Sequence, residues 1–111
     1  MNTSYFANLK NLDQQRVVSI AGKAPDWYKG KEYKQLAPKY WFFIKYKDDG
    51  DEEFYRTQYR KEVLEKLDPK EVYEELKDSI LLCWEARGKF CHRRLVAEWI
   101  ENKLNIEVLE L

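Results

Sequence analysis

The sequence predicts an α/β fold, with a single compact domain over residues 1–111 and a three- to four-stranded, mostly parallel sheet flanked by helices. Three observations predict it. The chain has 111 residues, which is near the commonest size of one domain. Apolar residues make up 44% of it, enough for one core. An apolar run, a helical pattern and a second β-branched run follow one another near the end, which is the order of a parallel βαβ unit.

The first half contains one clear strand and one irregular stretch. Val17 to Ile20 is a β-branched run ended by Gly22 and Pro25, and it is typical of a buried strand. Tyr5-Phe6 adds a short strand before it. Residues 23–38 mix glycine and proline with aromatic residues, which predicts an irregular but packed excursion.

Three helices are expected in the middle of the chain. Residues 40–46 look helical, and an Asp- and Gly-rich turn separates them from a second helix over residues 52–66. Asp68-Pro69, followed by Glu71, indicates a new helix start, because aspartate caps free amides, proline suits the first helical position and glutamate completes a capping box. This third helix runs to about residue 77.

The last third carries the βαβ pattern. Residues 79–84 contain the uninterrupted apolar run Ile80 to Cys83, which is typical of a central strand covered on both faces. From Cys91, apolar side chains recur at helical spacing as far as Leu104. Residues 106–109 then form the last strand.

Charge and cysteine usage indicate the environment. Residues 1–47 hold nine basic and three acidic residues, and residues 48–111 hold eleven and seventeen, so the halves attract each other or the first half meets an anionic partner. No apolar run is long enough to span a bilayer and no signal peptide is recognisable at Met1, so we expect a cytoplasmic protein without membrane contact. The cytoplasm is a reducing compartment, so Cys83 and Cys91 are expected to be packed or reactive rather than bridged.

A candidate site lies where the strand ending at Glu85 meets the helix that opens at Cys91. Ligands of parallel sheets bind beyond the carboxyl ends of the strands. Alternation along the strand places the side chains of Cys83 and Glu85 on the same face. In the helix, Cys91 and His92 lie near the core-facing stripe, whereas Arg93 and Arg94 are expected to point outward.

Cations in the first turn of that helix predict an anion beside it. Free amides and the positive end of the dipole disfavour Arg93 and Arg94 there unless a phosphate or carboxylate is near. The alternative is structural: Glu85 supplies the anion within the fold by pairing with Arg93 or His92.

The thiols have two interpretations. A thiol at a helix N-terminus with cationic neighbours has a lowered pKa, so Cys91 is either a nucleophile or a small core residue. Neighbouring helical residues diverge by about 100°, which makes a direct Cys91–His92 pair awkward and a Cys83–His92 pair easier. The spacing of Cys83, Glu85, Cys91 and His92 matches no standard zinc framework, so neither a metal nor a cofactor is expected.

The basic and aromatic first half is a second candidate. Lysines alternate with Trp27, Tyr28 and Tyr33, and an aromatic run follows at residues 40–43. Such a surface can stack bases and contact phosphates. The alternative is structural, because aromatic residues at this density also fill cores. The chain has no glycine-rich phosphate loop, Ser-centred elbow, HExxH or dinucleotide fingerprint, so most familiar enzyme classes have no support here.

One stretch resembles a known family. Leu81-Leu82-Cys83-Trp84-Glu85 followed by Cys91-His92-Arg93 is similar to the bacterial family of domain of unknown function 488, and the resemblance extends from Ser19 through Trp27-Tyr28, Leu36-Ala37-Pro38 and Tyr55 to Tyr59. It implies a compact α/β fold and a site at Cys83, Glu85, Cys91, His92 and Arg93. It implies no established reaction, substrate or cofactor.

We therefore expect a phosphate-bearing ligand, a nucleotide or nucleic acid, to bind at this pocket. Candidate ligand-binding residues are Arg93, Ser19, Trp27, Tyr28 and Tyr33. If the protein is an enzyme, Cys83 or Cys91 is the nucleophile, His92 or Glu85 the proton carrier and Arg93 the anion clamp. The alternative is a non-catalytic module that binds nucleic acid or an acidic protein on its first half, with the residues around Arg93 only fastening the fold.

Overall fold

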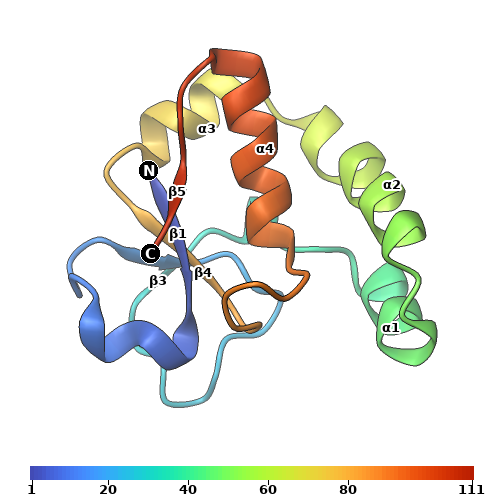
Figure 1. Cartoon of the computed structure of the whole chain (residues 1–111), viewed down its shortest axis with the longest axis horizontal. Helices are drawn as coiled ribbons and strands as arrows, with labels where there is room; N and C mark the ends of the chain where they lie inside the picture. Colours follow the sequence, from blue (N-terminus) through green and yellow to red (C-terminus); the bar gives the residue numbers. More distant parts are fainter.

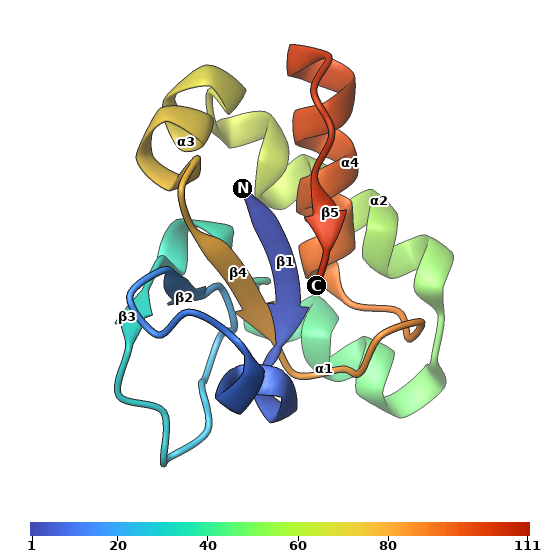
Figure 2. The ribbon, with the colours of Figure 1, turned by 60° about the vertical axis from the view of Figure 1, so that its left-hand side comes forward.

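The computed structural model describes all residues 1–111, and its centre is a parallel sheet of five strands. The strands are β1 (Asn2–Tyr5), β2 (Val17–Ser19), β3 (Lys31–Glu32), β4 (Ile80–Cys83) and β5 (Leu109–Glu110). They lie in the order β3-β2-β4-β1-β5, and every neighbouring pair is parallel (Figure 2). The predicted α/β fold is confirmed, with at least one strand more than expected.

Strand β4 is the centre of the sheet, as its apolar run predicts. All four of its residues are buried. Ile80 is in register with Val17 of β2 on one side and with Asn2 of β1 on the other. Because both edges of β4 are paired and both faces are covered, apolar side chains are favoured at every position.

The helices are α1 (Tyr40–Asp49), α2 (Glu52–Glu62), α3 (Pro69–Leu76) and α4 (His92–Leu104). Buried side chains from all four pack in one core cluster with Val18 and Leu81, so they cover the same face of the sheet. The other face carries Val17, Ile80 and Leu82, which pack against Phe6 and Tyr28. That face is covered by the 3-10 helix Phe6–Asn11 and a loop rather than by α-helices (Figure 1).

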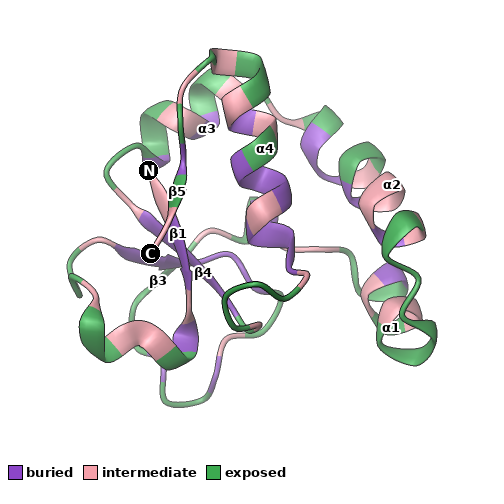
Figure 3. Ribbon diagram, in the orientation of Figure 1, coloured by how far each residue is buried: buried purple, intermediate pink, exposed green.

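Burial follows these two layers. The purple segments of Figure 3 run along the central strands and along the side of α4 that faces them. Helix α4 buries Leu95, Val96 and Ile100 at helical spacing and ends where Asn105 adopts a left-handed φ of 57°. The predicted end of this helix is confirmed.

The shortest elements differ most from the sequence predictions. Strand β1 begins at Asn2 and ends at Tyr5, so Phe6 lies outside it. Strand β3 lies inside the stretch predicted to be irregular, and β5 begins at Leu109 rather than at residue 106. The predicted helix over residues 52–66 ends at Glu62, and residues 64–66 form a 3-10 turn. Two-residue strands are set by the partner strand and not by an apolar period, so the sequence pattern does not reveal them.

The start of α3 is as predicted. The Asp68 carboxylate accepts a hydrogen bond from the amide of Lys70 at 2.9 Å, and Pro69 occupies the first helical position. None of the helices in the structure is both long enough and apolar enough to cross a membrane.

Candidate functional site

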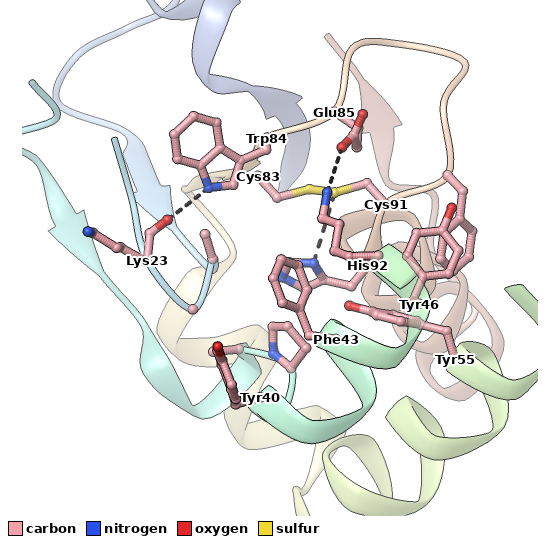
Figure 4. Close-up of a pocket in the computed structure, with 16 residues that line it drawn as sticks. Lys23, Tyr40, Phe43, Tyr46, Tyr55, Cys83, Trp84, Glu85, Cys91 and His92 are labelled. Carbon is pink, nitrogen blue, oxygen red and sulfur yellow. Dashed lines mark hydrogen bonds and ion pairs between the residues drawn. A yellow bond between two sulfur atoms is a disulfide. The ribbon is translucent and has the colours of Figure 1, made fainter. Parts of the chain in front are cut away.

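A cavity of about 570 Å³ opens at the carboxyl edge of the sheet. It lies where β2 and β4 end and where α1 and α4 begin, which is the usual ligand position in a parallel sheet. Figure 4 shows the side chains that line it. They are Ala21, Gly22, Lys23, Ala37, Pro38, Tyr40, Phe43, Tyr46, Lys47, Tyr55, Cys83, Trp84, Glu85, Phe90, Cys91 and His92.

The four residues predicted as catalytic candidates all contact this cavity. Cys83 is the last residue of β4, Glu85 follows two residues later, Cys91 caps α4 and His92 is the first residue of that helix. Cys83, Cys91 and His92 are buried, whereas Glu85 is partly exposed at the rim. The two sulfurs and the imidazole thus form the floor of the cavity.

The two cysteines are joined by a disulfide, which corrects the expectation of unbridged thiols. The loop over residues 84–90 turns back sharply, so that the end of β4 and the cap of α4 face each other with their Cα atoms 7.0 Å apart. Sequence spacing alone does not reveal this approach. In the oxidised state neither sulfur is a nucleophile, and reduction is required before either can react.

His92 is anchored to the neighbouring strand. Its Nε2 lies 2.7 Å from the carbonyl oxygen of Ile20, which can only accept, so Nε2 carries the proton. Nδ1 therefore presents its lone pair toward the Cys91 sulfur, 3.9 Å away (Figure 4). The pKa of His92 is lowered to about 4, mainly by burial; the bond to Ile20 opposes this shift and the positive charge of Arg93 adds to it. The imidazole is neutral at physiological pH.

The proximity of Cys91 and His92 corrects the prediction that this pair would diverge. The 100° rule applies to two helical residues, but Cys91 is the N-cap and has extended backbone angles of φ −156° and ψ 147°. Its side chain is therefore free to turn toward the ring of His92.

Glu85 does not pair with Arg93 or His92 through its carboxylate. Its Oε1 lies 3.5 Å from Lys47 Nζ of α1, across the cavity mouth. The pair is exposed, so it contributes little stability and is open to a ligand. Glu85 does contact Arg93, but through its backbone carbonyl, which accepts from Nη1 at 2.7 Å.

Arg93 is fully buried, so the prediction that it points outward is wrong. Its guanidinium donates to the Glu110 carboxylate, with Nη2 2.7 Å from Oε2, and its Nη1 lies 3.2 Å from the Cys83 sulfur. Burial alone would raise the pKa of the Glu110 carboxyl, but hydrogen bonds from Arg93 and Thr3 and the charge of Arg94 hold it below its ordinary value. The cation is neutralised within the fold and is not free to clamp a ligand.

The remaining ligand-binding candidates lie away from the cavity. The hydroxyl of buried Ser19 accepts a hydrogen bond from the Ala21 amide at 3.3 Å. Tyr28 packs against Phe6 on the far face, and its hydroxyl donates to the Lys31 carbonyl at 2.7 Å. Trp27 contacts the same phenylalanine edge-on.

Tyr33 is also used in packing, on the helical side of the sheet. It is partly buried against the main core cluster. Burial and the nearby Glu75 carboxylate raise the pKa of Tyr33 to about 12.

Aromatic side chains form walls of the cavity, and only Tyr40 and Phe43 among them belong to the aromatic run that was predicted as a base-stacking surface. Tyr40, Phe43 and Tyr46 come from α1, Tyr55 from α2 and Phe90 from the loop before α4. The sequence signal was present as an aromatic run from residue 40, but its period does not show which rings face a cavity. Burial raises the pKa of Tyr46 and of Tyr55, so both hydroxyls remain protonated at neutral pH.

A second hollow, of about 670 Å³, lies beside α4 and includes Cys91 in its lining. Its walls carry five basic and three acidic residues, so the acidic groups offset only part of the positive charge. The charged residues are Glu52, Arg56, Arg87, Lys89, Arg93, Arg94, Glu98 and Glu110.

Comparison with known proteins identifies the family of the chain. No curated protein and no solved structure matches the chain. A family model, DUF488-N3a, described as the active DUF488-N3 subclade, matches residues 5–104, which include the strands and helices that form the cavity. The chain therefore belongs to the DUF488 family.

Proposed function

We propose that the chain binds a phosphate-bearing ligand with a planar ring, of the nucleotide class, in the cavity at the carboxyl edge of the sheet. The observation that carries this proposal is the cavity itself, because about 570 Å³ falls within the usual range for small-molecule sites. Ten of its sixteen lining residues are hydrophobic. Rings such as Phe43, Tyr46 and Phe90 offer faces and edges on which a base can stack.

Two helix starts supply attraction for the anionic part of such a ligand. Tyr40, the first residue of α1, and His92, the first of α4, both line the cavity. Neither helix has a side-chain hydrogen bond at its N-cap. The first amides of a helix carry positive partial charge and bind phosphate readily when no side chain caps them.

Lysines at the rim add to this attraction. Lys23 and Lys47 line the cavity, and the ammonium of Lys34 donates to the Gly22 carbonyl at the same rim. Glu85 is the one acidic residue in the lining. A phosphate entering here would release Lys47 from its weak exposed pair with Glu85. In this proposal the lysines and helix starts, rather than Arg93, bind the phosphate.

A reaction at this ligand would take place at the floor, where the two sulfurs and the ring of His92 border the cavity. The alternative, a non-catalytic module that uses the first half of the chain, has less support. Tyr28 is buried and Tyr33 half-buried, so two of its aromatic residues already pack within the fold.

Thermal-shift measurements in metal-free buffer test the proposal with inorganic phosphate, nucleosides, nucleotides and short oligonucleotides. At a ligand concentration about 100 times Kd, specific binding stabilises the native state by about 2.7 kcal/mol. We expect nucleotides to raise the Tm more than phosphate or a nucleoside alone, because the ring and the phosphate contact different walls.

A matched pair of variants locates the binding. Lys23→Gln with Lys47→Gln removes two charges at the rim, and Lys61→Gln with Lys70→Gln removes two exposed charges elsewhere. The first variant should lose most of the nucleotide shift, and the second should keep it. Equal shifts in both variants, or no shift of the wild type with any of these compounds, would refute the proposal.

A further inference from the structure

Three potential metal ligands meet at the floor of the cavity. The sulfurs of Cys83 and Cys91 and a ring nitrogen of His92 all lie within 4.8 Å of one another. They come from the end of β4, the cap of α4 and the first residue of α4. All three residues are buried, and all three line the cavity (Figure 4).

The geometry of His92 leaves one nitrogen without a donor. Because Nε2 donates to the Ile20 carbonyl, Nδ1 of the neutral ring has a free lone pair. Its contact is the Cys91 sulfur at 3.9 Å, and a disulfide sulfur has no proton to donate. A buried acceptor that is aimed at two sulfurs and lacks a donor is suited to a thiol proton or a metal ion.

We propose that, once the disulfide is reduced, Cys83, Cys91 and His92 bind a zinc ion whose fourth position faces the cavity. Two thiolates, one imidazole and one open position form a known type of zinc site with an exchangeable ligand. Two thiolate charges balance the charge of the ion. The spacing matched no standard framework because the ligands meet through the sheet edge rather than within one short motif.

The zinc-bound state forms from the disulfide in two chemical steps, reduction and metal binding. A thiol reductant donates two electrons and two protons, the sulfur–sulfur bond breaks, and the reductant itself becomes a disulfide. Zinc then displaces one proton from each thiol. With Zn–S bonds of about 2.3 Å in tetrahedral geometry, the sulfurs must stand about 3.8 Å apart. The disulfide and the metal-bound state therefore exclude each other.

Neighbouring groups support two of the three ligands. The Ile20 carbonyl fixes the ring of His92 and increases the basicity of Nδ1. Arg93 Nη1, 3.2 Å from the Cys83 sulfur, stabilises negative charge on that atom. The positive charge of Arg93 is itself balanced by Glu110, so it does not oppose the ion.

Cobalt titration under anaerobic conditions tests the site without any nucleotide, so its result does not depend on the proposed ligand. The reduced wild type, with two thiols counted beforehand, should bind one Co²⁺ per chain. It should then show both tetrahedral d–d absorption and a thiolate-to-cobalt charge-transfer band. Zn²⁺ should abolish the bands and protect both thiols from alkylation.

Two controls separate this site from surface binding. The oxidised wild type has the same sequence and should show no charge-transfer band. Cys83→Ala with Cys91→Ala, a small change in volume at two buried positions, should also show none.

The role of His92 needs its own readout, because replacing a buried ring bonded to Ile20 also lowers stability. In the wild type, Zn²⁺ should shift the ¹⁵N resonance of Nδ1 and leave Nε2 protonated. The proposal is overturned if the reduced protein gives no charge-transfer band, if the band persists without the cysteines, or if Nδ1 does not respond to zinc.

Discussion

Replacing Glu110 with glutamine tests the ion pair that fastens β5 to α4 and the end of β4. Arg93 is fully buried, and its guanidinium makes three hydrogen bonds to the Glu110 carboxylate. Glutamine keeps the shape but removes the charge, so a buried cation is left uncompensated. Loss of one partner of a buried pair costs about 3–5 kcal/mol. Because the Glu110 side chain is 16% exposed, we expect about 3 kcal/mol.

That free energy converts into a measurable shift in Tm. Unfolding entropies near 2.1 cal/mol/K per residue imply about 4 °C per kcal/mol for a chain of 111 residues. Glu110→Gln should therefore melt about 13 °C below the wild type at pH 7. Glu107→Gln removes an exposed charge from the same segment and should change the Tm by less than about 2 °C.

The pH dependence follows from the lowered pKa of Glu110. A carboxyl whose folded pKa is depressed adds stability that is complete above its unfolded pKa, about 4.3, and is lost as the pH falls through its folded pKa. The difference between wild type and Glu110→Gln should therefore be full at pH 6 and should shrink below about pH 4. If Glu110→Gln melts within about 2 °C of Glu107→Gln at pH 7, the ion pair does not stabilise the fold as argued.

Two further predictions concern buried polar side chains. His92 has a pKa of about 4 when folded and about 6.5 when unfolded, so the unfolded chain takes up the proton first as the pH falls. The free energy of unfolding should drop by up to about 3 kcal/mol between pH 6.5 and 4, and an imidazole NMR signal that titrates near pH 6.5 in the folded protein would contradict this. Tyr59→Phe leaves the buried Leu36 carbonyl without the hydroxyl that now donates to it at 2.5 Å. It should cost about 1.5 kcal/mol in denaturant unfolding, whereas Tyr73→Phe, with no such bond, should cost less than about 0.5; equal costs would contradict the assignment.

Local signals were sufficient for some elements. Asp68-Pro69 placed the start of α3 because capping depends only on nearby amides. The apolar run Ile80 to Cys83 identified the central strand because a strand covered on both faces has no polar side. Strand β3, whose two residues Lys31 and Glu32 are exposed, carries no such signal; its position depends on pairing with β2.

The candidate site could be predicted as a location but not as a geometry. The end of β4 and the start of α4 lie together, as parallel topology requires. The burial of Arg93 was missed because its charge assigned it to the surface, although it lies four residues before Ala97 and seven before Ile100, which are both buried in α4. Its partner, Glu110, is 17 residues away on a strand that the pattern placed too early.

The position of Arg93 decides how the site can bind an anion. The guanidinium of Arg93 is fully buried, and four of its five N–H donors are already used, by Glu110, the Glu85 carbonyl and the Cys83 sulfur, so it is not available to a phosphate in the cavity. Releasing it would expose Glu110 and break the contact between β5 and α4. The groups that attract an anion to the cavity are therefore ones that can bind it without loss of folding stability. These are the uncapped starts of α1 and α4 and the exposed lysines at the rim. Arg93 does not contact the ligand in this proposal; it holds the Cys83 sulfur and the loop after β4 in position at the cavity floor.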